Sequence, residues 1–345
     1  MQLIKPDVNI NFVGRRKIAY AVSAAMILAS IVSLIVHGGP KYGIDFAGGA
    51  EVLVAFEKPV PIEKVKAALN VMGFNRPTVQ EYGDKNGDNY RILLSGDKAE
   101  SADLTTKLRK ELPVATGAAI NEGSFSFEMV GPQVGRDLRE KALLAMFFAL
   151  LFITVYISGR FELKWLISAG MAVALALAVY VLKLMGLSIP ALMIAAVVVT
   201  LVLFWVLNLK YAMGAIVALV HDVTITVGVF SMFGKEFTLP IIAALLTIIG
   251  YSLNDTIIVF DRIRENLRKH HRQPLATIIN RSVNETLSRT ILTSATTLLV
   301  VVILFLFGGG IIHDFAFALL AGIIVGTYSS IFVASPILLA WQRRN

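Results

Sequence analysis

The sequence predicts a polytopic α-helical membrane protein that carries one small α+β domain outside the lipid. Of the 345 residues, 56% are hydrophobic and only 16% are charged, and the mean hydropathy is +0.71. Uncharged apolar runs near the length of a bilayer crossing recur along the chain. One long polar stretch, residues 37–141, interrupts them and alternates between strand-like and helix-like patterns.

The apolar runs predict about eight membrane spans. Their expected bounds are residues 18–36, 142–158, 165–184, 187–207, 211–233, 239–260, 287–307 and 315–341. The first run is about long enough to cross a bilayer, and it lacks the short apolar core and small-x-small cleavage site of a signal peptide. We therefore interpret it as an uncleaved anchor.

Basic residues predict the orientation of the spans, because Lys and Arg accumulate in the short loops that stay in the cytoplasm. Sixteen basic residues lie on one side of the predicted spans, and only Lys183 and Lys235 lie in the short loops of the other side. We therefore expect a cytoplasmic N-terminus (residues 1–17), a cytoplasmic C-terminus (residues 342–345) and an outer domain (residues 37–141).

The formal charge of +8 is compatible with a nucleic-acid binder, but the basic residues lie at the ends of apolar segments and form no single patch. We expect no nucleic-acid partner. Residues 261–286 interleave Arg and Lys with Ile263 and Leu267, which predicts an interfacial amphipathic helix that contacts acidic lipid headgroups.

The outer stretch predicts a β-α-β-β-α-β order of ferredoxin type. The expected strands are residues 51–57, 78–82, 90–95 and 124–130, and the expected helices are residues 61–72 and 101–112. The stretch holds no residue cluster that suggests catalysis, so we expect binding or mechanical work and no enzyme activity. The chain has no cysteine, which excludes disulfides and thiolate metal sites, and we expect no cofactor.

Residues 43–49, Gly-Ile-Asp-Phe-Ala-Gly-Gly, invite comparison with a phosphate-binding glycine loop. They lack the GxGxxG spacing, a following Lys and a helix start. We interpret the glycines as allowing a tight backbone path between the first span and the outer domain.

Ionisable residues inside the predicted spans are the candidate functional groups, because a charge near the middle of a span costs roughly 2.5 to 3.5 kcal/mol on insertion scales. Asp222 lies 11 residues after Tyr211, which places it about 17 Å into its span, close to the midplane. Asp255 lies six residues before Asp261, about 9 Å inside the cytoplasmic edge. Arg289 begins the next span at a comparable depth.

A carboxylate and a guanidinium at matching depth can pair, which lowers the cost of burying both. Proton binding by Asp255 would then depend on whether its pair with Arg289 is formed, because desolvation favours the neutral acid when they separate. Proton passage and helix movement would become coupled. The alternative is structural: hydrogen bonding to a neighbouring span for Asp255 and Asp222, and cytoplasmic anchoring for Arg289.

We assign supporting polar roles to His221 beside Asp222, to Asn254 beside Asp255, and to Asp261 at the membrane edge. His221 has no second ligand at i+3 or i+4, so we expect no metal site. Hydroxyl and amide side chains in the same spans are expected to form interhelical hydrogen bonds more than a proton relay. They are Ser252, Asn254, Thr293, Ser294, Thr296 and Thr297.

Gly322 and Gly326 lie four residues apart in the last apolar run. Small residues at this spacing predict a face that packs closely against another helix.

Several blocks, in their order and spacing, resemble the SecD/SecF family of protein-export membrane proteins, and its SecF branch in particular. The blocks are Gly43–Phe46, Gly131–Gly135, Ala218–Asp222, Gly250–Arg268, Ser288–Thr290 and Gly322–Ser330. The resemblance covers nearly the whole chain.

One departure from the family pattern follows Arg160-Phe161-Glu162. The resemblance implies six spans, but here the expected continuation resumes only near Lys210, an offset of 46 residues (210 minus 164). An insertion of this length fits a hairpin of two crossings, residues 165–207, at about 1.5 Å per residue. We interpret this inserted hairpin as lipid-facing packing.

The resemblance implies a subunit that works with SecD and uses the proton motive force to assist protein export across the bacterial inner membrane. The implied partners are SecD, the SecYEG channel, YajC, exported polypeptides and membrane lipids. It also implies that Asp255 and Arg289 are the transport-linked acid and arginine, and that Asp222 supports them. Two alternatives stay open: a proton-coupled exporter of small molecules or lipids of the resistance-nodulation-division type, and a passive scaffold of the translocase.

Overall fold

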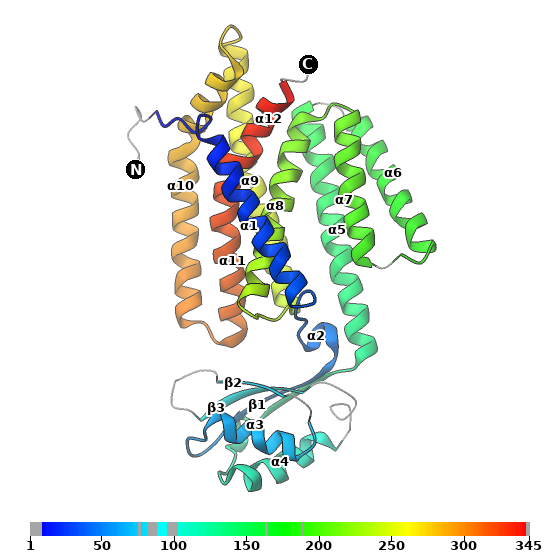
Figure 1. Ribbon diagram of the computed structural model, residues 1–345, viewed down its shortest axis with the longest axis vertical. Coiled ribbons are helices and arrows are strands. Elements are labelled where there is room, and N and C mark those ends of the chain that lie inside the picture. Colours follow the sequence, from blue (N-terminus) through cyan, green and yellow to red (C-terminus); the bar gives the residue numbers. More distant parts are fainter. Residues whose placement is uncertain are drawn as a thin grey trace.

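A bundle of long apolar helices stands against a small sheet domain (Figure 1). The structure is a computed structural model that describes residues 9–74, 77–81, 88–94, 103–162, 165–187 and 189–342. The bundle consists of α1 (Arg16–Val36), α5 (Pro132–Glu162), α6 (Trp165–Leu184), α7 (Ile189–Val206), α8 (Lys210–Met232), α9 (Leu239–Lys269), α10 (Leu275–Phe307), α11 (Gly310–Ser329), the π-helical turn η3 (Ser330–Ala334) and α12 (Ser335–Gln342).

The polytopic helical architecture is confirmed. Among the described residues, seven helical segments are long and apolar enough to cross a membrane, the last of them running from α11 through η3 into α12. The remaining predicted span corresponds to α7, whose apolar part, Ala191–Val206, is shorter than the others. Helices α6 and α7 form the predicted hairpin and lie at the edge of the bundle beside α5 (Figure 1).

The sheet domain follows the predicted β-α-β-β-α-β order. Its elements are β1 (Gly49–Ala55), α3 (Ile62–Val71), β2 (Thr78–Glu81), β3 (Asn89–Leu94), α4 (Leu104–Thr116) and β4 (Ser126–Val130). The strand order is β2-β3-β1-β4 with every neighbouring pair antiparallel, which is the arrangement of a split β-α-β fold of ferredoxin type. The sequence also predicts a turn at residues 83–88 and an N-cap at Ser101, and both residues 83–87 of this turn and Ser101 lie outside the described residues.

The domain core lies between the sheet and its two helices. Val52 of β1, Ile92 of β3 and Leu108 of α4 are fully buried there. Because side chains alternate along a strand, the intervening Glu51 and Arg91 point to the other face of the sheet. The sheet therefore presents one apolar face to α3 and α4 and a partly charged face away from them.

Helix α5 begins at Pro132, ten residues before the predicted span at residue 142. Proline suits a first helical turn, where its missing N–H would have no partner in any case. The last part of the stretch that we assigned to the outer domain is therefore a helical stem, continuous with the membrane span.

The prediction of one interfacial amphipathic helix at residues 261–286 is wrong. Helix α9 continues without a break to Lys269, and α10 starts at Leu275 and runs into the next span. The residues between them, His270–Pro274, form the turn, where Pro274 cannot continue a helix. The basic residues thus lie on a helical hairpin that extends beyond the bundle (Figure 1).

The glycine-rich segment contains a short helix, α2 (Ile44–Ala47), which the sequence did not predict. The tight path after it is confirmed: Gly48 has φ +77°, and a Cβ there would lie 2.8 Å from Pro132 Cα. Glycine is required because a side chain would meet the backbone at the start of α5. The chain enters β1 from α2 and leaves the domain along α5, so both connections meet at one point.

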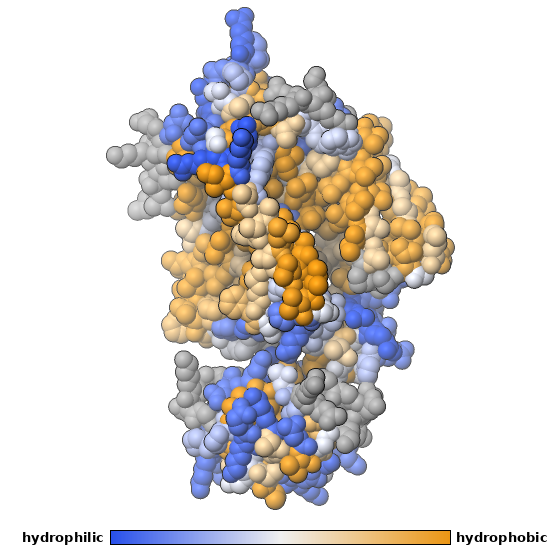
Figure 2. All heavy atoms as spheres, viewed as in Figure 1, coloured by the Kyte–Doolittle hydropathy of each residue, from blue (hydrophilic) through white to orange (hydrophobic). Residues whose placement is uncertain are grey.

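Surface hydropathy agrees with a membrane-spanning bundle. Apolar side chains cover the middle of the bundle, and hydrophilic residues gather at its far end and over the sheet domain (Figure 2). Helix α1 begins, and α12 ends, at the end of the bundle opposite the sheet domain (Figure 1).

Gly228 of α8 sets how closely α1 can approach. A Cβ at this position would lie 2.6 Å from Ser30 Cα, an atom of the α1 backbone that cannot turn aside. We expect Gly228→Ala to lower the free energy of unfolding by about 1 to 3 kcal/mol through overpacking. Thermal unfolding in detergent measures this, with Gly250→Ala as the control because a Cβ there meets nothing within 4 Å. Equal effects of the two variants would contradict the account of α1 and α8.

Candidate functional site

Asp222 is a buried acid with a complete set of hydrogen bonds. It lies on α8 and is 0% exposed. Its Oδ2 accepts hydrogen bonds from Ser252 Oγ of α9 (2.5 Å) and Ser329 Oγ of α11 (2.7 Å), and its Oδ1 lies 2.8 Å from His221 Nδ1. One carboxylate therefore holds α8, α9 and α11 together.

His221 extends this network towards α1. Its Nε2 lies 3.1 Å from Ser23 Oγ, which in turn lies 3.1 Å from Tyr328 Oη. Tyr328 Oη donates to the carbonyl oxygen of Ala19 (2.7 Å). Both ring nitrogens of His221 are thus engaged by protein groups, and the chain of contacts from Asp222 to α1 is continuous.

Asp255 has the opposite environment. It is 1% exposed on α9, and both of its carboxylate oxygens are buried without a hydrogen-bond partner among the described residues. A buried carboxylate that no donor solvates is costly in its charged form. The geometry therefore favours the neutral acid in this conformation.

The expected ion pair between Asp255 and Arg289 is absent from the described structure. Arg289 lies near the middle of α10, and its side chain is exposed. The side chain of Asp255 faces the bundle interior. The two side chains form no hydrogen bond and no ion pair within 4.0 Å. The sequence placed the two groups at matching depth without showing which side of each helix they occupy.

The paired and the unpaired acid are close neighbours along α9. Ser252, which donates to Asp222, precedes Asp255 by three residues, so they share a helix face one turn apart, about 4.5 Å along the axis. On α10, which packs against α9, Thr290 Oγ1 is also buried without a partner among the described residues. The interior therefore contains one satisfied polar centre and, adjacent to it, an unsatisfied one.

The supporting residues occupy different positions from those that the sequence suggested. Asn254 is exposed on the outer side of α9. Asp261 lies about two turns further along α9 and pairs with Arg160 near the end of α5, with Oδ2 2.7 Å from Nη2. Neither residue joins the network around Asp222.

Gly322 and Gly326 bring α11 against α9. A Cβ on Gly322 would lie 2.3 Å from Ile248 Cδ1, and one on Gly326 would lie 2.9 Å from Ser252 Cβ. The absence of both side chains therefore lets α11 carry Ser329 to within hydrogen-bond distance of Asp222.

Sequence reasoning missed Ser23, Ser329 and Thr290. Each is a hydroxyl residue inside an apolar run, which is a weak signal for interhelical hydrogen bonding. Helix α11 changes to the π-helical η3 directly after Ser329. A π-helical turn inside a helix often marks a functional position, but no residue pattern here predicts it.

A second feature connects the sheet domain to the start of α9. Tyr42 and Phe237 form a parallel bridge, in which Gly43 N donates to Phe237 O (2.8 Å) and Phe237 N donates to Lys41 O (2.7 Å). We call residues 41–45 together with residues 236–239 the α9 clamp.

An acid closes the clamp at the helix end. Asp45 Oδ2 accepts a hydrogen bond from Leu239 N, the first residue of α9, at 2.8 Å. Thr238, at the N-cap position, makes no side-chain cap of its own. Asp45 therefore satisfies one of the free N–H groups of α9 and places a negative charge at the positive end of the helix dipole.

Glu51 and Arg91 form a bidentate pair on the charged face of the sheet, at 2.7 and 2.8 Å. The hydrogen bond to Glu51 raises the pKa of Arg91 above its ordinary value, although desolvation opposes it. Glu236 and Asp314 also raise the pKa of Arg91 electrostatically. The acids at the outer ends of α9 and α11 are therefore near enough to act on the domain.

Among the described residues, no group of three His, Cys, Asp or Glu side chains could hold a metal ion. The polar interior is built from hydroxyls, one imidazole and two carboxylic acids. Such groups can bind, hold and pass protons.

Profile comparisons match most of the chain. A profile described as protein export membrane protein SecD/SecF, C-terminal, matches residues 114–189 and 179–344, and a SecD/SecF GG motif profile matches residues 33–60. The two stretches of the first profile overlap inside the α6–α7 hairpin. The second includes residues 41–45 of the α9 clamp.

Curated relatives agree with the profiles. A protein translocase subunit SecF from Desulfurispirillum indicum is 40% identical over 339 residues, covering 97% of this chain and 92% of the relative. One from Magnetococcus marinus is 42% identical over 341 residues, covering 98% and 94%.

Solved structures show the same fold. A crystal structure of SecDF from Thermus, a translocon-associated membrane protein, has 30% identity and a TM-score of 0.71, covering 99% of this chain. A super-membrane-facing form of SecDF has 31% identity and a TM-score of 0.56 over 100% of this chain. The chain spans 40% of the length of each of these SecDF chains.

Replacing each of the two buried acids by leucine should have different effects on thermal stability. Asp222→Leu leaves Ser252, Ser329 and His221 without their acceptor, and each buried unsatisfied group costs about 1 to 3 kcal/mol. Asp255→Leu removes an acid that has no partner, which is neutral or stabilising. We expect thermal unfolding in detergent to show a clear fall in Tm for Asp222→Leu and none for Asp255→Leu. Equal falls would contradict the unpaired state of Asp255.

Proposed function

Because the chain belongs to the SecD/SecF family of protein-export membrane proteins, we propose that it is the accessory translocase subunit that couples proton movement to protein export. It works with SecD beside the SecYEG channel and YajC in the bacterial inner membrane. Its substrates in this sense are exported polypeptides, and protons supply the free energy.

The unpaired, buried Asp255 is the observation that carries this proposal. A structural acid would be expected to have donors around it, as Asp222 does. An acid without donors binds a proton in this conformation and releases it when a cation or water reaches it. In membrane proteins such ionisable residues mark ion and proton pathways.

Arg289 is the cation best placed to drive the release. It lies on α10, which packs directly against α9. A rotation or shift of α10 that brings Arg289 inward would stabilise the carboxylate and expel its proton. Return of Arg289 to the exposed position would favour uptake of the next proton.

Asp222 serves as the fixed point of this movement. Its bonds to Ser252 and Ser329 hold α9 and α11 on α8, so α10 can move against a stable unit. Asp222 therefore supports the transport step by holding these three helices in place.

The outer side of α9 supports a helical partner. Its exposed mid-membrane residues are small or polar: Ala243, Thr247, Gly250 and Asn254. Small residues permit close helix approach, and an amide can hydrogen-bond across helices in lipid. We assign this stripe to SecD, since ion pathways of transporters often lie where two repeats meet.

The orientation follows from the distribution of charge. Basic residues concentrate on the α9–α10 hairpin and around the start of α1. Both segments lie at the end of the bundle opposite the sheet domain (Figure 1). The positive-inside rule places this end in the cytoplasm and the sheet domain in the periplasm.

The α9 clamp supplies the mechanical connection. It joins the periplasmic domain to the first residue of the helix that carries Asp255. When α10 shifts against the unit of α8, α9 and α11, the clamp makes the periplasmic domain, which meets the exported chain, move together with that unit.

Asp255→Asn tests the proton step. The amide keeps the volume but cannot lose a proton, so proton-motive-force-dependent export in membrane vesicles should be abolished while SecD still copurifies. Glu265→Gln is the control, because this acid is exposed on the same helix. Unchanged export with Asp255→Asn would favour a passive scaffold, and loss of proton-coupled extrusion of small molecules with intact export would favour an exporter.

Asp45 tests the coupling. Asp45→Ala removes the acceptor for Leu239 N, at a cost of about 0.5 to 2 kcal/mol at the helix end, whereas Asp45→Asn keeps an acceptor oxygen. We expect export to fall several-fold with Asp45→Ala and much less with Asp45→Asn. A disulfide between Tyr42→Cys and Phe237→Cys in this cysteine-free chain should leave export intact, because the clamp moves as one unit. Export blocked by the disulfide would contradict this.

A further inference from the structure

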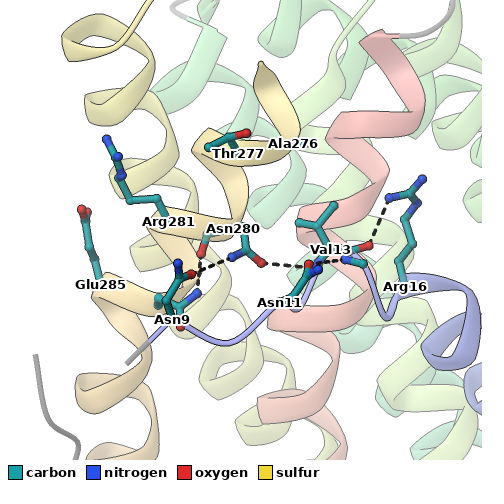
Figure 3. Close-up of a pocket in the computed structure, with 11 residues that line it drawn as sticks. Asn9, Asn11, Val13, Arg16, Ala276, Thr277, Asn280, Arg281 and Glu285 are labelled. Carbon is teal, nitrogen blue, oxygen red and sulfur yellow. Dashed lines mark hydrogen bonds between the residues drawn. The ribbon is translucent and has the colours of Figure 1, made fainter. Parts of the chain in front are cut away.

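A polar hollow lies at the cytoplasmic end of the bundle, between the N-terminal segment and the first turns of α10 (Figure 3). Its volume is about 710 Å³. One wall is residues 9–16, and the other is residues 276–285. The proton site, the α9 clamp and the α9 stripe do not contribute to it.

Two asparagines on α10 fix the N-terminal wall. Asn284 Oδ1 accepts from Ile10 N (2.8 Å), and Asn280 Nδ2 donates to Ile10 O (3.0 Å). Asn280 Oδ1 also accepts from Phe12 N (2.8 Å). Because backbone groups of the segment are held by side chains one turn apart, the hollow is a formed site and its wall is not a loose flap.

Two arginines line the hollow from opposite walls. Arg16 Nη1 donates to Val13 O (3.1 Å), which leaves its other N–H groups available. Arg281 forms no hydrogen bond or ion pair with any described residue, although it is half-buried. Five N–H donors on each guanidinium suit them to a phosphate.

One acid, Glu285, also lines the hollow, but its carboxylate already interacts with other residues. Glu285 Oε2 accepts from Asn266 Nδ2 (2.8 Å) and lies 3.6 Å from Arg262 Nε. The remaining lining groups include the hydroxyl of Thr277 and the amide of Asn11. The hollow therefore presents unmatched positive charge together with neutral hydrogen-bonding groups.

The depth of the arginines in the membrane identifies the source of the anion. Arg16 lies two residues before the apolar run that begins at Ile18, and Arg281 lies six residues, about 9 Å, before the run that begins at Leu287. Both positions fall in the headgroup layer of the cytoplasmic leaflet. This leaflet is anionic, and basic pockets between helices on its side bind lipid headgroups.

We propose that this hollow binds the phosphate of an anionic phospholipid, with Arg16 and Arg281 as its cationic ligands. The bound lipid joins α1 to α10 through one headgroup. Since α10 also carries Arg289, two turns further into the membrane, the lipid composition of the leaflet sets how freely that helix moves. The choice of leaflet rests on the orientation given under the proposed function, and the binding experiment below tests the site separately from export.

Calorimetric titration of the full chain in phosphatidylcholine nanodiscs with a short-chain phosphatidylglycerol tests the site. We expect the double variant Arg16→Gln/Arg281→Gln to bind about 30-fold more weakly, since each cation near the surface contributes about fivefold. Arg268→Gln/Arg272→Gln removes the same charge from exposed positions outside the hollow and should bind as the wild type does. Arg16→Lys/Arg281→Lys keeps the charge but lacks the planar guanidinium. Its affinity for the lipid should lie between those of the wild type and the Arg16→Gln/Arg281→Gln variant.

Three outcomes would overturn the proposal. Equal weakening in both Gln double variants would show diffuse attraction to basic residues. Unchanged binding in the Arg16/Arg281 variant would show that the lipid binds elsewhere. Glycerol phosphate binding as tightly as the lipid would show a site for a soluble phosphate compound. If the Arg16→Gln/Arg281→Gln variant unfolds, the Arg16→Lys/Arg281→Lys variant tests the site instead. Weaker lipid binding by this Lys variant than by the Arg268→Gln/Arg272→Gln control would still locate the site at the hollow.

Discussion

The structure depends on how two acids are buried in one apolar bundle. A carboxylate inside a membrane protein is stable when donors surround it and costly in its charged form when none do. Asp222 has Ser252, Ser329 and His221 around it, whereas Asp255, one turn from Ser252 on the same helix, has no hydrogen-bond partner among the described residues. The first acid joins three helices of the bundle, and the second is the acid to which we assign proton exchange.

The position of these acids connects local chemistry to the outer domain. Helix α9 carries Asp255 near its middle, and its first residue is held by Asp45 from the segment that leads into β1. A 31-residue helix without an internal break transmits displacement along its axis. Under the proposed function, a displacement of this helix therefore reaches the sheet domain without a chain of side-chain contacts between the acid and the domain.

Much of the architecture could be predicted because it rests on periodicity and length. Apolar runs gave the spans, alternating patterns gave β1 to β4, and the offset after Glu162 gave the α6–α7 hairpin. The extent of α5 and the continuity of α9 and α10 beyond the lipid could not be predicted from hydropathy, because polar helical turns resemble loops on that scale. Pro274 marks the turn at His270–Pro274 in the sequence. The prediction nevertheless placed this turn inside a single amphipathic helix, residues 261–286.

The sequence identified the main residues of the site but predicted only part of their arrangement. Depth along a helix can be counted from the sequence, which singled out Asp222, Asp255 and Arg289. The rotation of each helix about its axis cannot be counted in this way, so the sequence paired Asp255 with Arg289 although Arg289 is exposed in the structure. The donors to Asp222 come from positions about 30 and 107 residues away in the chain, and only tertiary packing brings them together.

Infrared spectroscopy of the full chain in lipid nanodiscs tests the central claim most directly, because a protonated carboxyl group absorbs separately from a carboxylate. The account predicts a protonated-carboxyl band in the resting chain that disappears in Asp255→Asn and persists in Glu265→Gln. A resting spectrum in which Asp255→Asn removes a carboxylate band, and no protonated-carboxyl band, would contradict it.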